Sequence, residues 1–280
     1  SMNANFRVVS LFFDYLYQHY SSLWYSQFMI NYKLIFLLTL YILLLFSDSS
    51  YGAKSIRIYW ENGSLMNETH YNGEKLGRVE SCPDKMIFVS KGFFWTGEEG
   101  KLKNIVNESF CIDRTEVTQK KYKIKMGVNP SHNNGKNNPV ENVSWFQAQQ
   151  YCKSLNKRLP TEMEWEKAAR SGSKTKYYWG NKINSLYLWY SHNSSYKSHP
   201  VALKKPNDYG LSDMLGNVYE WTDSWYSKDK KFRVLRGGSW ANRKNSVRVS
   251  YRDRAGPSEK GSDIGFRCVK KINRINSALK

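Results

Sequence analysis

The stretch from Ser171 to Val269 constrains the fold most, because it holds many large aromatic side chains within almost no regular pattern. It is rich in Gly, Asn, Ser and Trp, and its apolar pieces are short, namely Tyr177–Trp179, Val218–Trp221, Val234–Leu235 and Gly265–Val269. This composition predicts short strands separated by long ordered loops. A core with so little regular structure needs clamps, so we expect either disulfides or bound metal ions.

An uncharged apolar run of 13 residues, Leu34–Phe46, lies near the N-terminus. Lys33 precedes it and the small and polar residues Ser47–Gly52 follow, which is the arrangement of a secretory signal peptide. The run is shorter than the roughly 20 apolar residues of a membrane-spanning helix. We therefore expect translation from Met29, cleavage before Ala53, and export to the periplasm or the medium. An uncleaved N-terminal anchor is the alternative.

Four cysteines, Cys82, Cys111, Cys152 and Cys268, follow the predicted cleavage site. An even number in an exported chain predicts two disulfides, and composition alone leaves all three pairings open. None of the four forms a CxxC pair, so the sequence gives little support to a zinc site or to thioredoxin-type chemistry.

The formal net charge is +19, while hydrophobic residues make up 40% of the chain, enough for a packed core. A positive surface favours anionic partners such as nucleic acid, acidic glycans or anionic lipids, and the alternative, which we prefer, is that the lysines form a solvating surface. No zinc-finger, helix-turn-helix or RNA-recognition signature is present, so nucleic acid is not an expected partner. We divide the chain into a leader (1–52), a loosely structured polar extension (53–81), a main domain (82–270) and a basic tail (271–280).

Three short helices are predicted inside the main domain. The first begins at Thr118 and ends at Gly127. The other two open with capping boxes, Ser144 with Gln147 and Thr161 with Glu164, in which each side chain bonds the backbone amide at the other end of the pair. Upstream, Met86–Val89 and Gly92–Gly97 flank a Ser-Lys pair and are expected to form a hairpin.

Six blocks of sequence then point to a family. They are, in chain order, residues 111–118 (CIDRTEVT), 139–145 (PVENVSW), 158–165 (RLPTEMEW), 206–221 (PNDYGLSDMLGNVYEW), 236–240 (RGGSW) and 265–268 (GFRC). Together they resemble the formylglycine-generating enzyme, or sulfatase-modifying factor, family. The resemblance runs from about Met86 to Val269. It implies a compact, loop-rich α+β domain with low regular secondary structure, related to C-type lectins.

The same resemblance implies two kinds of clamp. Cys152 and Cys268 match family positions that form a disulfide, which leaves Cys82 to pair with Cys111. A structural calcium ion is implied at positions that match a family site, through two side-chain oxygens and two backbone carbonyls, and calcium takes six to eight oxygen ligands. These positions are Asp213, Gly216, Val218 and Glu220. The alternative is that Asp213 caps a turn and Glu220 pairs with a cation.

The chain departs from the family where catalysis occurs. Formylglycine generators use two cysteines after the GGS motif, and the matching positions here are Asn242 and Val247. An amide and a branched alkane supply neither a thiolate nor a soft-metal ligand, so copper is not expected. Ser239 and Trp240 would keep the wall of the substrate cleft.

Three functions stay open at this point. The first is a non-catalytic binding or accessory domain whose cleft holds an acidic peptide, a glycan or a protein. The predicted cleft residues are Ser239, Trp240, Asn242, Arg243, Arg248 and Arg252, although about half of the arginines in this segment are expected to pair with Asp253, Asp263 or Glu164 instead. The second is a maturation enzyme of the same family with cysteine-independent, oxidoreductase-type chemistry. The third, a working formylglycine generator, is disfavoured by the missing cysteines.

Overall fold

The computed structural model describes residues 54–59, 65–71, 82–83 and 85–272. The predicted leader with its apolar run and most of the basic tail lie outside these residues. The chain divides into two compact units, residues 1–56 with 70–74 and residues 57–69 with 75–280. Strands β1 (Lys54–Tyr59) and β2 (Leu65–Tyr71) pair with each other. The sequence had predicted a loosely structured stretch over residues 53–81, and the structure instead forms these two strands within it.

A three-stranded sheet opens the main domain. Its order is β11-β6-β3, with β3 (Met86–Val89) and β11 (Val269–Lys271) both antiparallel to the central strand β6 (Phe110–Asp113). All four residues of β6 are buried, as expected for a strand that is paired on both edges. This sheet joins the two ends of the domain.

The predicted hairpin between Met86–Val89 and Gly92–Gly97 is wrong. Strand β4 (Gly92–Thr96) turns away from β3 and pairs with β5 (Leu102–Val106), across the short 3₁₀ helix η2 (Glu98–Gly100). The chain leaves β3 through Gly92 at φ +117°, a conformation that favours glycine and breaks the line of the strand. β3 then pairs with β6 instead.

A four-stranded mixed sheet carries most of the later part of the chain. Its order is β10-β7-β8-β9, built from β7 (Tyr219–Trp225), β8 (Arg233–Arg236), β9 (Arg252–Ala255) and the two-residue strand β10 (Ile264–Gly265). β10 is parallel to β7, and the other pairs are antiparallel. Long connections separate these strands, as the sequence predicted.

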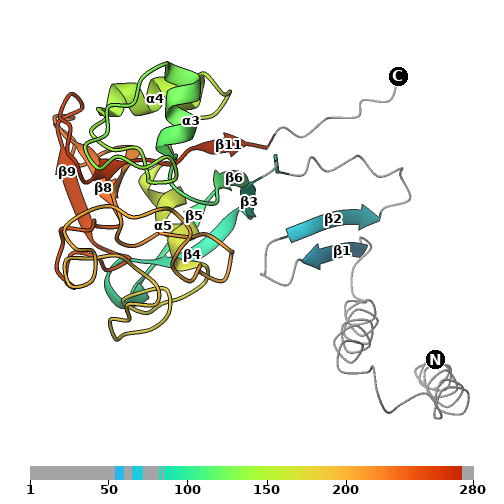
Figure 1. The fold of residues 1–280 in the computed structure, drawn as a ribbon. Helices are drawn as coiled ribbons and strands as arrows, with labels where there is room; N and C mark the ends of the chain where they lie inside the picture. The colour runs from blue at the N-terminus through green and yellow to red at the C-terminus, as the bar shows by residue number, and fades with distance from the viewer. Residues whose placement is uncertain (1–53, 60–64, 72–81, 84, 273–280) are drawn as a thin grey trace, which may run out of the picture. The chain divides into compact units, whose positions relative to one another are not determined.

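The three helices form where their capping signals predicted them. Helix α3 (Gln119–Met126) has Thr118 as its N-cap. Both α4 (Trp145–Lys153) and α5 (Glu162–Arg170) have complete capping boxes at their N-termini. Each box satisfies amides that the first helical turn leaves without a partner. Helix α5 packs against β4 and β5, which lie beside it in Figure 1.

Two hydrophobic clusters fill the domain, and two disulfides close it. One cluster contains Trp165 and Val247, and the other contains Trp221 and Phe266. The disulfides are Cys82–Cys111 and Cys152–Cys268, which confirms the predicted pairs. Among the residues that the structure describes, no helix is long and apolar enough to cross a membrane.

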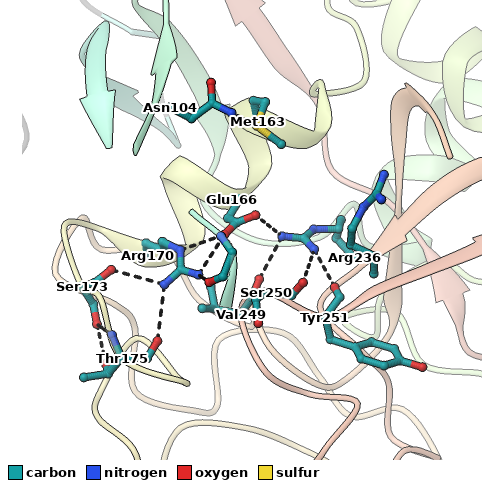
Figure 2. A network of polar contacts seen from close by, with 12 residues as sticks. Asn104, Met163, Glu166, Arg170, Ser173, Thr175, Arg236, Val249, Ser250 and Tyr251 are labelled. Carbon is teal, nitrogen blue, oxygen red and sulfur yellow. Dashed lines mark hydrogen bonds and ion pairs between the residues drawn. The ribbon is translucent and has the colours of Figure 1, made fainter. Parts of the chain in front are cut away.

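Helix α5 also anchors a buried network of charges (Figure 2). Glu166 accepts hydrogen bonds from Arg170 Nε at 2.9 Å and from Arg236 Nη2 at 2.6 Å. The Arg170 and Arg236 side chains are 1% and 0% exposed. Arg236 donates further to the carbonyls of Val249, Ser250 and Tyr251. The network therefore fixes the loop before β9 to α5.

Candidate functional site

The loop after β8 holds Asn242 and Val247, the two positions at which the sequence resemblance predicts catalytic cysteines in other members. Gly237 and Gly238 adopt φ values of +91° and +73°, which turn the chain sharply out of the strand. Ser239 follows and is fully buried. Its amide donates to Asn242 Oδ1 at 2.7 Å, and its hydroxyl lies 2.9 Å from both Asn242 Oδ1 and Asp263 Oδ2. A hydroxyl has one proton, so two acceptors share this donor.

Asn242 is thus an acceptor that closes a turn. Its side-chain oxygen holds the Ser239 amide and faces the hydroxyl, and its own backbone amide donates to the Ser239 carbonyl at 3.1 Å. The amide group at this position has a structural task that a thiolate would not perform in the same way. Asp263, which completes the group, was named in the sequence analysis only as a partner for arginine.

Val247 belongs to the core. It is 0% exposed and lies in the same hydrophobic cluster as Trp165. A Cβ atom on Gly238 would lie 2.7 Å from Val247 Cγ1, so glycine is required for the close approach of the two segments. The second cysteine position therefore presents a packed methyl group.

The remaining predicted cleft residues divide into two groups. Arg252 binds Glu162 through two hydrogen bonds, and Arg248 pairs with Glu98. Two of the arginines are therefore structural, as anticipated, but with Glu162 and Glu98 in place of the predicted partners Asp253, Asp263 and Glu164. These partners come from segments distant in sequence, so no local pattern marks them.

Trp240 and Arg243 stay available at the surface. The Trp240 indole is partly exposed and its Nε1 donates to the Ser262 carbonyl at 3.2 Å. Arg243 is exposed, and within the described part of the chain its guanidinium has no hydrogen-bonding or ion-pair partner. An aromatic face and a free cation thus flank the Ser239–Asn242 turn.

Two hollows occur elsewhere on the described surface. One, of about 560 Å³, is lined by aromatic and polar residues that include Tyr178, Trp179 and Tyr187. The other, of about 400 Å³, lies between α3 and the loop after it and is lined by Gln119, Lys123 and their neighbours. None of the predicted cleft residues lines either hollow.

A cluster of buried charges lies at the predicted calcium positions. Glu220 is 1% exposed and accepts hydrogen bonds from Arg267 and from Trp165 Nε1. Asp213 accepts from the Ala202 amide at 2.6 Å through Oδ2. Asp213 Oδ1 has no hydrogen-bond partner although it is buried.

Glu116 joins this cluster and was missed by the sequence analysis. It is 0% exposed, Oε1 accepts from Asn217 Nδ2 at 3.1 Å, and buried Oε2 has no partner. Burial and the nearby Asp213 carboxylate raise the pKa of Glu116 well above its ordinary value. Burial raises the pKa of Asp213 to about 6. The two carboxyl groups are thus buried close enough to disfavour each other's charged form, and each has one oxygen without a hydrogen-bond partner.

The loop around these carboxylates is tightly constrained. Gly216 has φ +77°, and a Cβ atom there would lie 2.1 Å from the Trp189 carbonyl oxygen. The side-chain oxygen of Asn217 accepts a hydrogen bond from the backbone amide of His199, and the backbone amide of Asn217 donates to the carbonyl of Trp189. No set of three acidic, His or Cys side chains among the described residues is arranged to hold a metal by itself. A cation here needs backbone carbonyls as well as carboxylates.

These features define a loop-rich α+β domain whose GGS loop lacks the cysteine pair. Residues 74–272 match the sulfatase-modifying factor enzyme 1-like domain. The chain is 42% identical over 154 residues to "Inactive C-alpha-formylglycine-generating enzyme 2" of Bos taurus, and that match covers 49% of this chain and 51% of the bovine protein. The chain belongs to the sulfatase-modifying factor family, and it spans about half the length of that relative.

Two further proteins are similar over a larger share of the chain. Chaperone protein LppX of Paenibacillus barcinonensis is 29% identical over 250 residues, which covers 67% of this chain and 89% of that protein. The solved structure of Treponema denticola variable protein 1 superposes with a TM-score of 0.62 at 27% identity, covering 79% of this chain and all of that one. The fold expected from the sequence is thus confirmed.

Proposed function

We propose that this protein is an exported, non-catalytic member of its family that binds an acidic ligand. The observation that carries the proposal is the chemistry of the two cysteine positions. Asn242 closes a hydrogen-bonded turn on Ser239, and Val247 is packed in the core. Neither residue supplies a thiolate, the species that binds a soft metal and begins thiol redox chemistry. The bovine relative carries the word inactive in its name, in agreement with this view.

The ligand surface that we propose lies on the outer side of the Ser239–Asn242 turn. Trp240 offers a planar face, and Arg243 offers a guanidinium without a partner among the described residues. A guanidinium binds a carboxylate or a sulfate through two parallel hydrogen bonds. An acidic peptide or an acidic glycan has the matching groups, and the two disulfides are compatible with an oxidising compartment.

Replacing Arg243 by Ser should weaken binding of a fluorescent oligo-glutamate peptide by about fivefold, since one exposed charge contact contributes up to about 1 kcal/mol. Fluorescence anisotropy measures the change. The matched control is Arg114→Ser, because Arg114 is also exposed and its side chain also lacks a partner among the described residues. Equal affinity of both variants would contradict the proposed surface.

We also propose a structural calcium ion at the Asp213–Glu220 loop. The support is the pair of buried carboxylate oxygens without partners, Asp213 Oδ1 and Glu116 Oε2, beside a loop shaped by Gly216. A divalent cation would neutralise both. Glu116 would thus join the residues that the family resemblance supplies, Asp213, Gly216, Val218 and Glu220. Both Glu220 oxygens already accept two hydrogen bonds each, from Arg267 and Trp165, so Glu220 would bind the ion only by exchanging one of these contacts.

Calcium removal should lower the melting temperature of the wild type. A ligand that binds only the folded state raises the free energy of unfolding by about 2.7 kcal/mol when its concentration is a hundredfold above its dissociation constant. Calorimetry of chelated protein with and without added calcium tests this. Asp213→Asn keeps an acceptor for the Ala202 amide but removes the charge, so its melting temperature should not respond to calcium. A wild-type melting curve that calcium does not change would contradict the calcium site and leave Asp213 with only the role of capping a turn.

A further inference from the structure

The β4–β5 hairpin carries exposed apolar side chains that lie outside the proposed ligand site. Phe93 lies opposite Ile105, and Trp95 lies opposite Lys103. Side chains on a strand alternate between two faces, so these four share one side, which we call the outer face. Phe93, Ile105 and Trp95 are 65%, 43% and 36% exposed. Large aromatic side chains grouped in this way indicate an interaction surface.

The inner face of the same hairpin is held firmly by helix α5. Asn104 Nδ2 lies 3.1 Å from Met163 Sδ, and both residues are labelled in Figure 2. The Lys167 ammonium group donates to the Gly92 carbonyl at 2.8 Å, and the Gly97 amide donates to Glu166 at 2.9 Å. The outer face is therefore presented on a fixed support.

Lysine side chains cover the aromatic rings of the outer face. The Lys103 ammonium group lies 4.4 Å from the centre of the Phe93 ring, and the Lys174 group lies 3.7 Å from the centre of the Trp95 ring. Neither lysine has a carboxylate partner among the described residues. The outer face thus combines apolar rings with uncompensated positive charge.

The acidic residues at the tip of the hairpin do not cancel this charge. Glu98 pairs with Arg248, and Glu99 pairs with Lys101 at 3.3 Å. Each tip carboxylate is therefore matched by its own cation, which leaves Lys103 and Lys174 as the excess. The formal charge of +19 over the whole chain has the same sign.

The chemistry of the face distinguishes between possible occupants. The cores of protein–protein interfaces are depleted of lysine, because burying an unpaired ammonium group is costly. At a membrane surface, by contrast, aromatic rings lie at the headgroup level while lysines contact anionic headgroups. We propose that the outer face of the β4–β5 hairpin docks this protein on an anionic lipid surface, with Phe93 and Trp95 in the interface.

Co-sedimentation with vesicles tests this docking. Wild-type protein should bind vesicles of equimolar phosphatidylcholine and phosphatidylglycerol, and should bind pure phosphatidylcholine much less. The double variant Phe93→Ser/Trp95→Ser should lose about tenfold in partitioning, since interfacial binding scales with buried apolar area. Lys103→Glu/Lys174→Glu should abolish the preference for phosphatidylglycerol while keeping the aromatic pair.

The matched control is Ile124→Ser/Val128→Ser, which removes two apolar side chains that are 76% and 58% exposed elsewhere on the domain. This control should bind vesicles as the wild type does. Melting curves verify that each variant folds. Absence of vesicle binding by the wild type, equal binding by the aromatic variant, or a wild-type dimer that the aromatic variant dissociates would each overturn the proposal.

Discussion

Replacing Glu166 by Gln is expected to lower the free energy of unfolding by about 3–5 kcal/mol, the usual cost of leaving a buried charge without its partner. Glu166 accepts from both Arg170 and Arg236, whose side chains are almost fully buried. Gln has nearly the same shape but removes the negative charge, so Arg170 loses its carboxylate partner and Arg236 keeps only Glu162, 3.7 Å away. Urea unfolding monitored by tryptophan fluorescence measures the loss.

An exposed ion pair provides the comparison for Glu166. Glu108 and Lys271 lie 2.9 Å apart, and their side chains are 61% and 60% exposed. Glu108→Gln should cost less than about 1 kcal/mol because water screens the pair. If both variants lost similar amounts, the buried network would not be the main anchor between α5 and the loop before β9.

Removal of the Cys152–Cys268 disulfide is the second change that we expect to lower the stability of the domain strongly. Cys152 and Cys268 are 116 residues apart, while Cys82 and Cys111 are 29 apart. By restricting the unfolded chain, the first cross-link should stabilise the fold by about 5 kcal/mol and the second by about 3.5 kcal/mol, before any strain is subtracted. The double variant Cys152→Ala/Cys268→Ala should therefore unfold at lower urea concentration than Cys82→Ala/Cys111→Ala. The reverse order would show that loop length does not govern the clamping of this domain.

Local sequence signals predicted the positions of helices and strands correctly, but they did not predict which strands pair with each other. The capping boxes at Ser144 and Thr161 placed two helices correctly, because the hydrogen bonds of a cap involve residues three positions apart. The strands Met86–Val89 and Gly92–Thr96 were also placed well, yet they pair with β6 and β5 and not with each other. A short turn between two apolar runs predicts a hairpin, but the burial of β3 in a larger sheet decides the pairing.

The same limit applies to the candidate site. The family resemblance located the GGS loop and the Cys152–Cys268 disulfide, and the Cys82–Cys111 disulfide followed by elimination. The buried carboxylate of Glu116 was missed, since it lies about a hundred residues before Asn217, which it contacts through a single hydrogen bond. The ion-pair partners of Arg248 and Arg252 were missed for the same reason, as they come from residues 98 and 162. Contacts of this kind depend on the tertiary fold and leave no periodic trace.

Formylglycine formation from a cysteine peptide is the measurement that tests the central claim most directly. The purified protein is incubated with a sulfatase-type peptide, copper and oxygen, and mass spectrometry follows conversion of the cysteine to the aldehyde, with a formylglycine-generating enzyme that has both cysteines as the positive control. We expect no conversion, because neither Asn242 nor Val247 offers a thiolate that could bind copper. Aldehyde formed by the unmodified protein would contradict the binding-domain account and require a mechanism without cysteine.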